Sequence, residues 1–240
     1  MFALFIHIYN QDSWEKILRE QLVSIQEFSP LVLVNLCMTH PGNAELICSI
    51  RNILPEAYII TTSNKGRDIG GKLALTDFYM KAGLHSDHIV FLHDKQSHHW
   101  FLGESWRQKL FEIIEPAKIR AILEEYRRDP KAGVIGASDF IKNEFDNKTN
   151  EFKTTNNNKI KELISTYNLK LNDYQFVAGS MFWVRSSIIK RFFSTYSALS
   201  CREKLEEGNF TDQFEGTYTH SWERIFCFLA NDQGFTIKGI

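Results

Sequence analysis

Three clusters of polar residues in this sequence have the composition needed to bind an anion, hold a metal ion or move a proton. The first is the glycine-rich segment SNKGRDIGG at residues 63–71, in which Gly66 and Gly70 permit tight backbone turns. Free backbone N–H groups ahead of a helix form an anion site, and Arg67 adds a cation to it. A glycine turn with an Arg67–Asp68 surface pair would show the same pattern, so the segment alone gives weak support for a phosphate site.

The second cluster combines His93, Asp94, Lys95 and Ser97. Asp94, together with His93, could hold Mg²⁺ or Mn²⁺, because both ions favour carboxylate oxygen ligands. Alternatively, Lys95 and Arg67 could neutralise phosphate charge directly, one as a point charge and the other as a bidentate fork. A polar turn at the end of a strand would have the same composition.

The third cluster is EGTYTHSWER at residues 215–224. If a helix begins within it, His220 and Glu223 lie one turn apart on the same face. Either side chain could act as a general base with a pKa raised toward the working pH. A capped helix with Glu223 and Arg224 in solvent would fit the same spacing.

A regular fold must position these clusters, and the first half of the chain alternates strand and helix patterns. Short apolar runs are followed by segments whose apolar residues recur at helical spacing. This alternation predicts a parallel sheet with right-handed crossovers, whose ligand sites lie at the carboxyl ends of the strands. Tyr9, the 63–71 segment and the His93 cluster all follow such ends. The predicted strands are residues 2–8, 31–38, 57–62 and 89–92, and the predicted helices lie within 14–25, 43–53 and 72–82.

The second half is less regular. The Asn-rich residues 142–158 are predicted to form a loop without regular structure. We find no internal repeat and no linker, so we expect a single α/β domain over residues 1–240. The remaining predictions are helices within 106–114, 119–127, 159–167, 186–196 and 220–231, and strands at 132–137 and within 176–185.

Composition excludes several classes of protein. The 240 residues carry 28 Lys and Arg against 29 Asp and Glu, so the basic excess of a general nucleic-acid binder is missing. No apolar run approaches the roughly 20 residues of a membrane helix. The opening MFALFIHIYN lacks a basic n-region and is expected to be a core strand rather than a signal peptide. The four cysteines contain no CxxC pair and are expected to be buried thiols, in a cytoplasmic protein.

Four motifs, taken together, resemble the rhamnan synthesis protein F family of bacterial surface-polysaccharide glycosyltransferases. In chain order they are NKGRDIGG, FLHDKQS, FVAGSMFWVR and EGTYTHSWERIF, which span residues 64–226. The earlier segment IHIYNQDSWEKILREQLVSI resembles the first strand and helix of GT-A nucleotide-sugar glycosyltransferases. The resemblance implies a GT-A-like, Rossmann-type fold with a mostly parallel sheet flanked by helices. Residues 1–100 would form the nucleotide-binding half and residues 101–240 a helical, irregular acceptor-side half.

The resemblance also implies roles for individual residues. Glu223 or His220 would be the general base of an inverting transferase, and Asp94 would complete the catalytic set. Asp68 would accept a ribose hydroxyl or a base edge, and Arg67 would contact phosphate. The expected nucleotide-sugar-binding residues are Tyr9, Asn64, Gly66, Arg67, Asp68, Gly70, His93, Lys95 and Ser97.

The acceptor or donor sugar is expected near Gly179, Phe182 and Trp183. One of the two aromatic rings would stack on a sugar and the other would enter the core, although both could be core residues. The chain departs from the Asp-x-Asp pattern of GT-A enzymes, because Asp94 is the one acid in its motif. Dependence on Mn²⁺ or Mg²⁺ through Asp94 and His93 is therefore left open.

The implied function is transfer of rhamnose or another hexose from a nucleotide diphosphate donor to a hydroxyl of a bacterial surface polysaccharide. The expected partners are the nucleotide sugar and a glycan or lipid-linked glycan acceptor, with no nucleic acid. Peripheral contact with the cytoplasmic membrane face or with other polysaccharide-assembly proteins fits this role. Two alternatives remain: a non-catalytic nucleotide-sugar-binding or scaffold module, and a metal-dependent hydrolase using His93, Asp94, His98 and His99.

Overall fold

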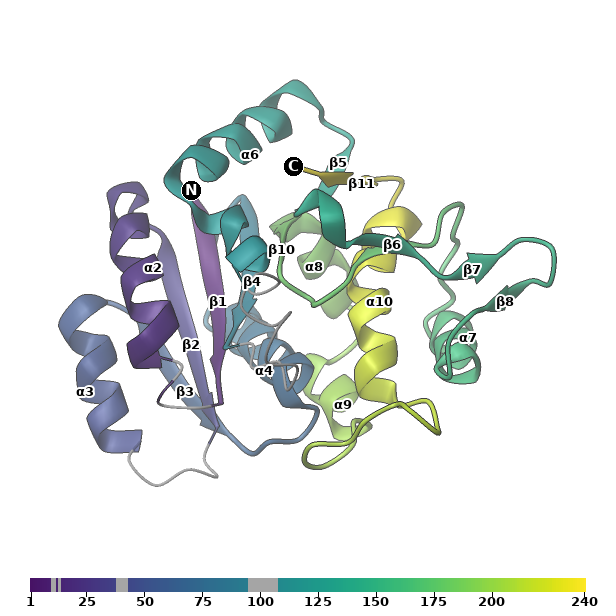
Figure 1. The fold of residues 1–240 in the computed structure, drawn as a ribbon, viewed down its shortest axis with the longest axis horizontal. Helices are drawn as coiled ribbons and strands as arrows, with labels where there is room; N and C mark the ends of the chain where they lie inside the picture. The colour runs from purple at the N-terminus through teal and green to yellow at the C-terminus, as the bar shows by residue number, and fades with distance from the viewer. Residues whose placement is uncertain (10–11, 13, 38–42, 95–107) are drawn as a thin grey trace.

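The centre of the molecule is a mostly parallel sheet. In the computed structural model, which describes residues 1–9, 12, 14–37, 43–94 and 108–240, this sheet has seven strands in the order β11-β5-β10-β4-β1-β2-β3 (Figure 1). β10 is antiparallel to its neighbours β4 and β5, and the other pairs are parallel. The predicted α/β fold with a mostly parallel sheet is confirmed. The strands are β1 (Phe2–Ile8), β2 (Leu31–Cys37), β3 (Tyr58–Thr62), β4 (His88–His93), β5 (Ala132–Gly136), β10 (Phe182–Arg185) and β11 (Thr236–Gly239).

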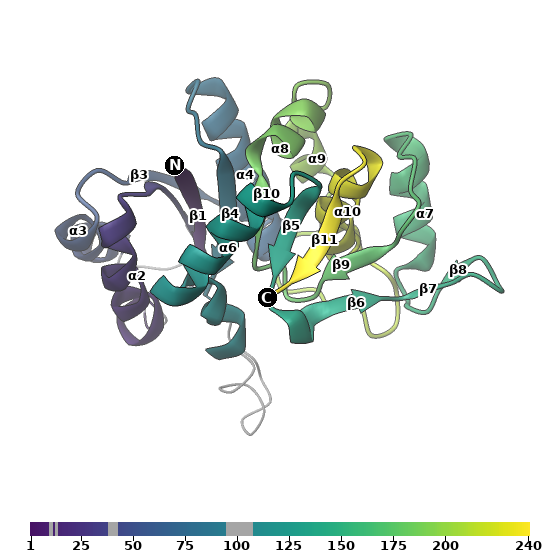
Figure 2. The same ribbon diagram turned by 90° about the horizontal axis from the view of Figure 1, so that it is seen from above.

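Helices cover both faces of this sheet (Figures 1 and 2). One face carries α2 (Arg19–Ile25), α3 (Asn43–Ile53) and α6 (Pro116–Arg128), and the other carries α4 (Arg67–Lys81), α8 (Ser186–Phe193) and α10 (Tyr218–Asp232). Next to α4 lies α9 (Ala198–Glu203), and next to α10 lies α7 (Asn157–Thr166). A π-helical turn, η1 (Trp14–Leu18), precedes α2, and 3₁₀ turns follow as η2 (Gln26–Phe28), η3 (Glu112–Ile114) and η4 (Ser138–Phe140).

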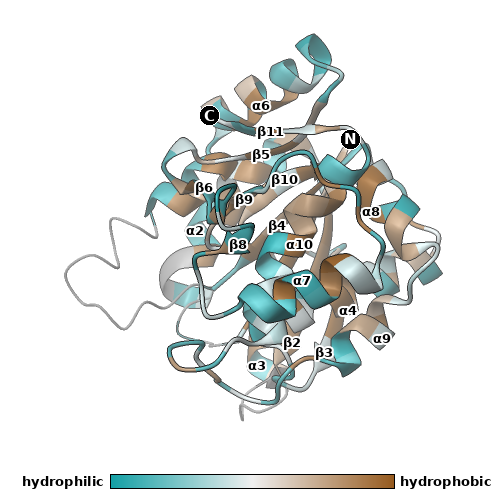
Figure 3. Cartoon of the chain, turned by 90° about the vertical axis from the view of Figure 1, so that its right-hand side faces the viewer, coloured by the Kyte–Doolittle hydropathy of each residue, from teal (hydrophilic) through white to brown (hydrophobic). Residues whose placement is uncertain are grey.

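The core lies between the sheet and its two helical layers. Every residue of β1 is buried, as expected for a central parallel strand that is covered on both faces. Figure 3 shows largely hydrophobic central strands, whereas α7 and the hairpin beside it are mostly hydrophilic. The continuous apolar runs that predicted the strands therefore mark the elements covered on two sides.

The prediction of an irregular loop over residues 142–158 is wrong. β6 (Ile141–Asn143) pairs with β9 (Gln175–Val177), and β7 (Phe145–Asp146) pairs with β8 (Glu151–Phe152) in a hairpin. Aromatic packing supports this hairpin: Phe145 stacks on Tyr174 with ring centroids 3.8 Å apart, and Phe152 packs against Phe228 of α10. These partners lie far along the chain, so the polar local composition hid them.

Three further expectations differ from the structure, and one strand was missed. The segment 176–185 is two strands, β9 and β10, separated by a turn in which Gly179 and Ser180 have φ values of 85° and 53°. α4 begins at Arg67 rather than at residue 72, because the glycine-rich segment turns directly into it. Cys48 is exposed, unlike the other three cysteines. The edge strand β11 was not predicted.

Candidate functional site

Most residues singled out from the sequence lie at the carboxyl edge of the parallel strands, at the lower end of the sheet in Figure 1. β1, β3 and β4 end there, at Ile8, Thr62 and His93. Because β10 is antiparallel and its Phe182 pairs with Phe91, the turn that precedes β10 reaches the same edge. This is the edge at which open parallel sheets bind their ligands.

The glycine-rich segment forms the turn into α4, and its geometry requires two of its glycines. Gly66 has a left-handed φ of 72°, and a Cβ atom there would lie 2.2 Å from Leu205 Cδ1. A Cβ atom on Gly70 would lie 1.8 Å from the carbonyl oxygen of Lys65. Arg67 also has a positive φ, 52°, which is uncommon for a residue with a side chain. The turn is therefore tightly constrained.

Two backbone donors of this turn are already paired. The Gly66 N–H donates to the carbonyl oxygen of Glu206 at 2.8 Å, and the Arg67 N–H donates to that of Asn64 at 3.1 Å. The Asn64 side chain is buried and donates to Asn209 Oδ1 at 3.1 Å. The backbone anion site predicted for this segment therefore does not include the N–H groups of Gly66 and Arg67.

A buried lysine that the sequence analysis did not single out lies at the centre of the site. The ammonium of Lys72, fully buried, donates to Asp68 Oδ2 at 2.8 Å and to the carbonyl and hydroxyl oxygens of Ser180 at 2.7 and 2.6 Å. The Ser180 hydroxyl also donates to Asp68 Oδ2 at 2.7 Å, and Lys72 Nζ lies 3.4 Å from His93 Nδ1. A buried charge is tolerated when it is paired and hydrogen-bonded. The cluster thus joins α4, the turn before β10 and the end of β4.

His93 is the last residue of β4 and Asp94 follows it, but the two do not form a metal site by themselves. Asp94 Oδ2 accepts the N–H of Tyr9 at 2.8 Å, and the Asp94 N–H donates to the carbonyl oxygen of His7 at 3.1 Å. The ammonium of Lys72 beside His93 Nδ1 would repel a cation at that nitrogen. Among the described residues, no three His, Cys, Asp or Glu side chains gather to hold a metal ion. A cation at Asp94 would therefore need further ligands, such as the phosphate oxygens of a donor.

Four residues singled out in or just after this second cluster fall outside the described part of the chain. They are Lys95 and Ser97, expected to contact the nucleotide sugar, and the histidines of the hydrolase alternative, His98 and His99.

Glu223, expected to be a general base, is held on both oxygens. Its Oε1 accepts the N–H of Gly179 at 2.6 Å, and its Oε2 accepts from Arg224 Nη1 at 2.5 Å. Arg224 also forms a bidentate pair with Glu144 of the hairpin, with distances of 3.1 and 2.7 Å. Glu144 had no signal in the sequence, because its partner lies 80 residues away. Each carboxylate oxygen of Glu223 retains a second lone pair for a substrate proton.

His220, the other candidate base, lies in the first turn of α10. Its backbone N–H is capped by the Thr217 hydroxyl oxygen, and its Nδ1 lies 2.7 Å from the same oxygen. Burial lowers the pKa of His220, although the carboxylates of Asp212 and Glu223 oppose this effect. The neutral ring is thus favoured near neutral pH, and its Nε2 lies 3.9 Å from Asp212 Oδ1.

A continuous series of contacts connects the three predicted clusters. Glu223 accepts from Gly179, the next residue Ser180 accepts from Lys72, and Lys72 contacts both Asp68 and His93. These residues come from α10, the turn between β9 and β10, α4 and β4. The structure therefore brings together side chains that are up to 155 residues apart in the sequence, the separation between Asp68 and Glu223.

Phe182 and Trp183 do not line this site. Both side chains are fully buried. Phe182 packs edge-on against Phe91, with centroids 5.4 Å apart, while Trp183 packs on Phe2 and donates its Nε1–H to the carbonyl oxygen of Ile113 at 2.9 Å. The expectation that one of these rings stacks on a sugar is wrong for this structure, because both belong to the core.

Comparison with known protein families agrees with the order of the motifs. The profile of the rhamnan synthesis protein F family matches residues 1–235. This chain belongs to the rhamnan synthesis protein F family. The resemblance carried by the four motifs is thereby confirmed.

Two solved structures resemble this family member in fold. One is the mannosyltransferase PcManGT from Pyrobaculum calidifontis in complex with GDP-Man and Mn²⁺, with a TM-score of 0.45 and 10% identity, over 100% of this chain and 54% of that one. The other is S. aureus TarS 1–349, with a TM-score of 0.45 and 11% identity, over 96% of this chain and 55% of that one. The chain thus spans about half the length of these two structures. No curated protein matches it significantly.

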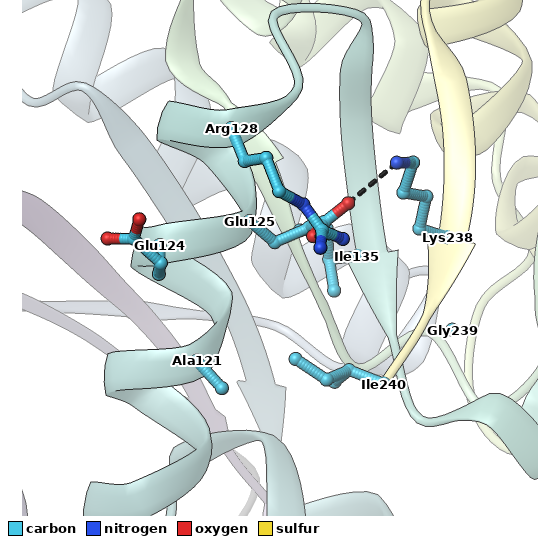
Figure 4. A pocket seen from close by; sticks show the side chains of 8 residues that line it. All are labelled: Ala121, Glu124, Glu125, Arg128, Ile135, Lys238, Gly239 and Ile240. Carbon is cyan, nitrogen blue, oxygen red and sulfur yellow. Dashed lines mark hydrogen bonds and ion pairs between the residues drawn. The ribbon is translucent and has the colours of Figure 1, made fainter.

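A separate pocket of the protein lies between α6, β5 and β11, away from the residues described above (Figure 4). Three of its charged side chains pair with one another: Glu125 Oε1 accepts from Lys238 at 2.6 Å, and Arg128 donates to Glu125 Oε2. We assign it no function.

Within the part of the chain that the structure describes, no helix is long and apolar enough to cross a membrane.

Proposed function

We propose that this chain transfers a hexose, rhamnose or another, from a nucleotide diphosphate donor to a hydroxyl of a bacterial surface polysaccharide, with inversion at the anomeric carbon. Membership of the rhamnan synthesis protein F family supports the transferase class. The observation that carries the proposal is the position of Glu223, held by Gly179 and Arg224 and connected through Lys72 to His93 at the end of β4.

In this proposal, Glu223 is the general base. The acceptor hydroxyl loses its proton to the Glu223 carboxylate while its oxygen attacks the anomeric carbon and the bond to the diphosphate breaks. The hydrogen bonds from Gly179 and Arg224 fix the carboxylate before the substrate arrives, so little reorganisation is needed during the reaction. His220 lies one turn earlier on α10 and is the second candidate for this role.

The leaving diphosphate is assigned to the carboxyl edge of β1, β3 and β4. Arg67 would contact a phosphate, Tyr9 and Asn64 would border the nucleoside, and Asp94 would accept Mg²⁺ or Mn²⁺ shared with the phosphates. Asp68 Oδ2 is used by Lys72 and Ser180, which favours a positioning role for Asp68 over a contact with the ribose. Residues 1–100 remain our proposed nucleotide half and residues 101–240 our proposed acceptor half.

Substitution of Glu223 tests the catalytic assignment. Glu223→Gln retains the shape and the contact with the Gly179 N–H, but it removes the basic oxygen, so turnover should fall about 100-fold or more. The matched control is Glu20→Gln, on the exposed surface of α2, which should leave turnover unchanged. Near-normal turnover in a folded Glu223→Gln variant would rule out this base.

Donor binding is measured separately, by thermal unfolding with a panel of nucleotide diphosphates and nucleotide sugars, each with Mn²⁺ and with EDTA. A ligand at 100 times its Kd should add about 2.7 kcal/mol to the stability of the wild type and of Glu223→Gln. A shift without transfer to any acceptor would support a non-catalytic binding module instead. No shift with any nucleotide would contradict the transferase proposal.

A further inference from the structure

The segment that joins α9 to α10, residues 204–217, presents two phenylalanine side chains to solvent. Phe210 is 57% exposed and Phe214 is 96% exposed. Among the phenylalanines that the structure describes, these are the two that are exposed. Burying such a side chain would stabilise the fold by about 1.5–3 kcal/mol, so two exposed rings in one short segment suggest a contact with another molecule.

The backbone that carries these rings is attached to the donor side of the candidate site. Arg67 Nη1 donates to the carbonyl oxygen of Phe210 at 3.2 Å. Asn209 accepts from Asn64 at 3.1 Å and lies 3.4 Å from the Tyr9 hydroxyl. Phe210 is thus held directly beside residues to which we assign the nucleotide sugar. Figure 1 shows the segment at the same lower end of the molecule as the carboxyl ends of β1 to β3.

The other part of the segment is attached to the helix that carries the proposed base. The Glu206 carboxylate accepts the N–H groups of Tyr218 and Thr219, at 2.6 and 2.9 Å, in the first turn of α10. Asp212 accepts from the Asn156 side chain at 2.6 Å. The segment is therefore anchored at several points, while its two aromatic rings point into solvent.

The chemistry of the segment favours a carbohydrate as the bound molecule. Pyranose rings pack their C–H faces on aromatic rings and present hydroxyl groups at their edges. Here, Asn209 and Thr211 flank Phe210, and Gln213 precedes Phe214, so neutral donors and acceptors for such hydroxyls lie next to both rings in the sequence. The segment holds one lysine and four carboxylates, a net charge of 1 − 4 = −3, which would repel an anionic lipid surface.

We infer that Phe210 and Phe214 form a stacking platform for pyranose rings of the acceptor glycan beside the transfer site. This inference rests on the proposed function. It gives the acceptor-side aromatic role to the 204–217 segment in place of the buried Phe182 and Trp183. The platform lies between the donor residues at Arg67 and the start of α10, where an acceptor must approach.

The test compares the wild type with Phe210→Ala, Phe214→Ala and the double variant. Acceptor and donor concentrations are varied separately, with a panel of soluble rhamnose and glucose oligosaccharides as acceptors. Each substitution should raise the acceptor KM about fivefold to tenfold, while the donor KM and the melting temperature stay unchanged, because exposed side chains contribute little to stability. Val23→Ala is the matched control, since Val23 is 55% exposed on α2, outside the segment.

A second readout separates this inference from the proposed function. Saturation-transfer NMR detects binding of the same oligosaccharides whether or not sugar is transferred. Weaker binding by the double variant supports the platform even if the wild type proves inactive. Equal oligosaccharide affinity and acceptor KM in the wild type and the double variant would overturn the platform while leaving the transferase proposal intact. The platform would also be overturned, in favour of a membrane contact, if the double variant lost the binding of the wild type to anionic phospholipid vesicles while its oligosaccharide binding stayed unchanged.

Discussion

The Lys72→Met substitution tests how strongly the buried cluster contributes to stability. Methionine keeps an unbranched side chain of similar length and similar helix propensity, but it removes the ammonium. The Asp68 carboxylate would then lose its cation, and Ser180 would lose two hydrogen bonds. Removing one partner of a buried ion pair costs about 3–5 kcal/mol. Because the Asp68 side chain is 20% exposed and water can reach it, we expect a value near the lower end, about 3 kcal/mol.

α4 also supplies the control. Lys81 pairs with Asp77 at 3.0 Å with the same i,i+4 spacing, but its side chain is 70% exposed. Lys81→Met should therefore cost only about 0.5 kcal/mol. Urea unfolding followed by circular dichroism, with linear extrapolation to water, gives both values on one scale.

The double variant Lys72→Met/Asp68→Asn identifies the cause of the loss. It removes the stranded carboxylate charge, so it should be more stable than Lys72→Met alone by about 1 kcal/mol or more. The reasoning is refuted if Lys72→Met and Lys81→Met lose the same stability within about 0.5 kcal/mol. It is also refuted if the double variant is less stable than Lys72→Met, because the loss would then not come from an unpaired charge.

Two further predictions concern His7, a buried residue near the end of β1. Burial lowers the pKa of His7 to about 4, an effect that Asp68 opposes, whereas an unfolded histidine titrates near 6.5. The unfolded state therefore binds more protons between these pH values, so protonation of His7 should lower the free energy of unfolding by about 2–3 kcal/mol from pH 7 to pH 4.5. Urea titrations at the two pH values should show that the free energy of unfolding of His7→Gln falls by about 2–3 kcal/mol less than that of the wild type. Equal losses in the two proteins would contradict the assignment. Gly71→Ala would place a Cβ atom 2.2 Å from His7 Nδ1 and 2.9 Å from Asn35 Nδ2. The substitution should therefore destabilise the fold by about 1–3 kcal/mol, despite the better helix propensity of alanine. An unchanged or higher melting temperature would contradict this prediction.

The sequence predicted the architecture where local pattern is sufficient. β1 is observed at the predicted residues 2–8, because a central parallel strand is a continuous apolar run. The edge of the sheet that carries the site also followed from sequence, since parallel strands bring all their carboxyl ends to one side. The tight turn of the 63–71 segment was also predicted, because Gly66 and Gly70 permit backbone conformations that other residues rarely adopt.

Only the tertiary structure decided which polar residues are buried and which aromatic residues are exposed. Lys72 looks like an ordinary surface lysine of a helix, and its burial depends on Ser180, 108 residues later. Trp183 looked available for a ligand, yet its ring is buried against Phe2 and hydrogen-bonded to Ile113, whereas Phe214 in a polar segment stays in solvent. Periodicity depends on near neighbours along the chain, so a sequence displays it directly. Burial depends on contacts between distant segments, and these exist only once the chain has folded.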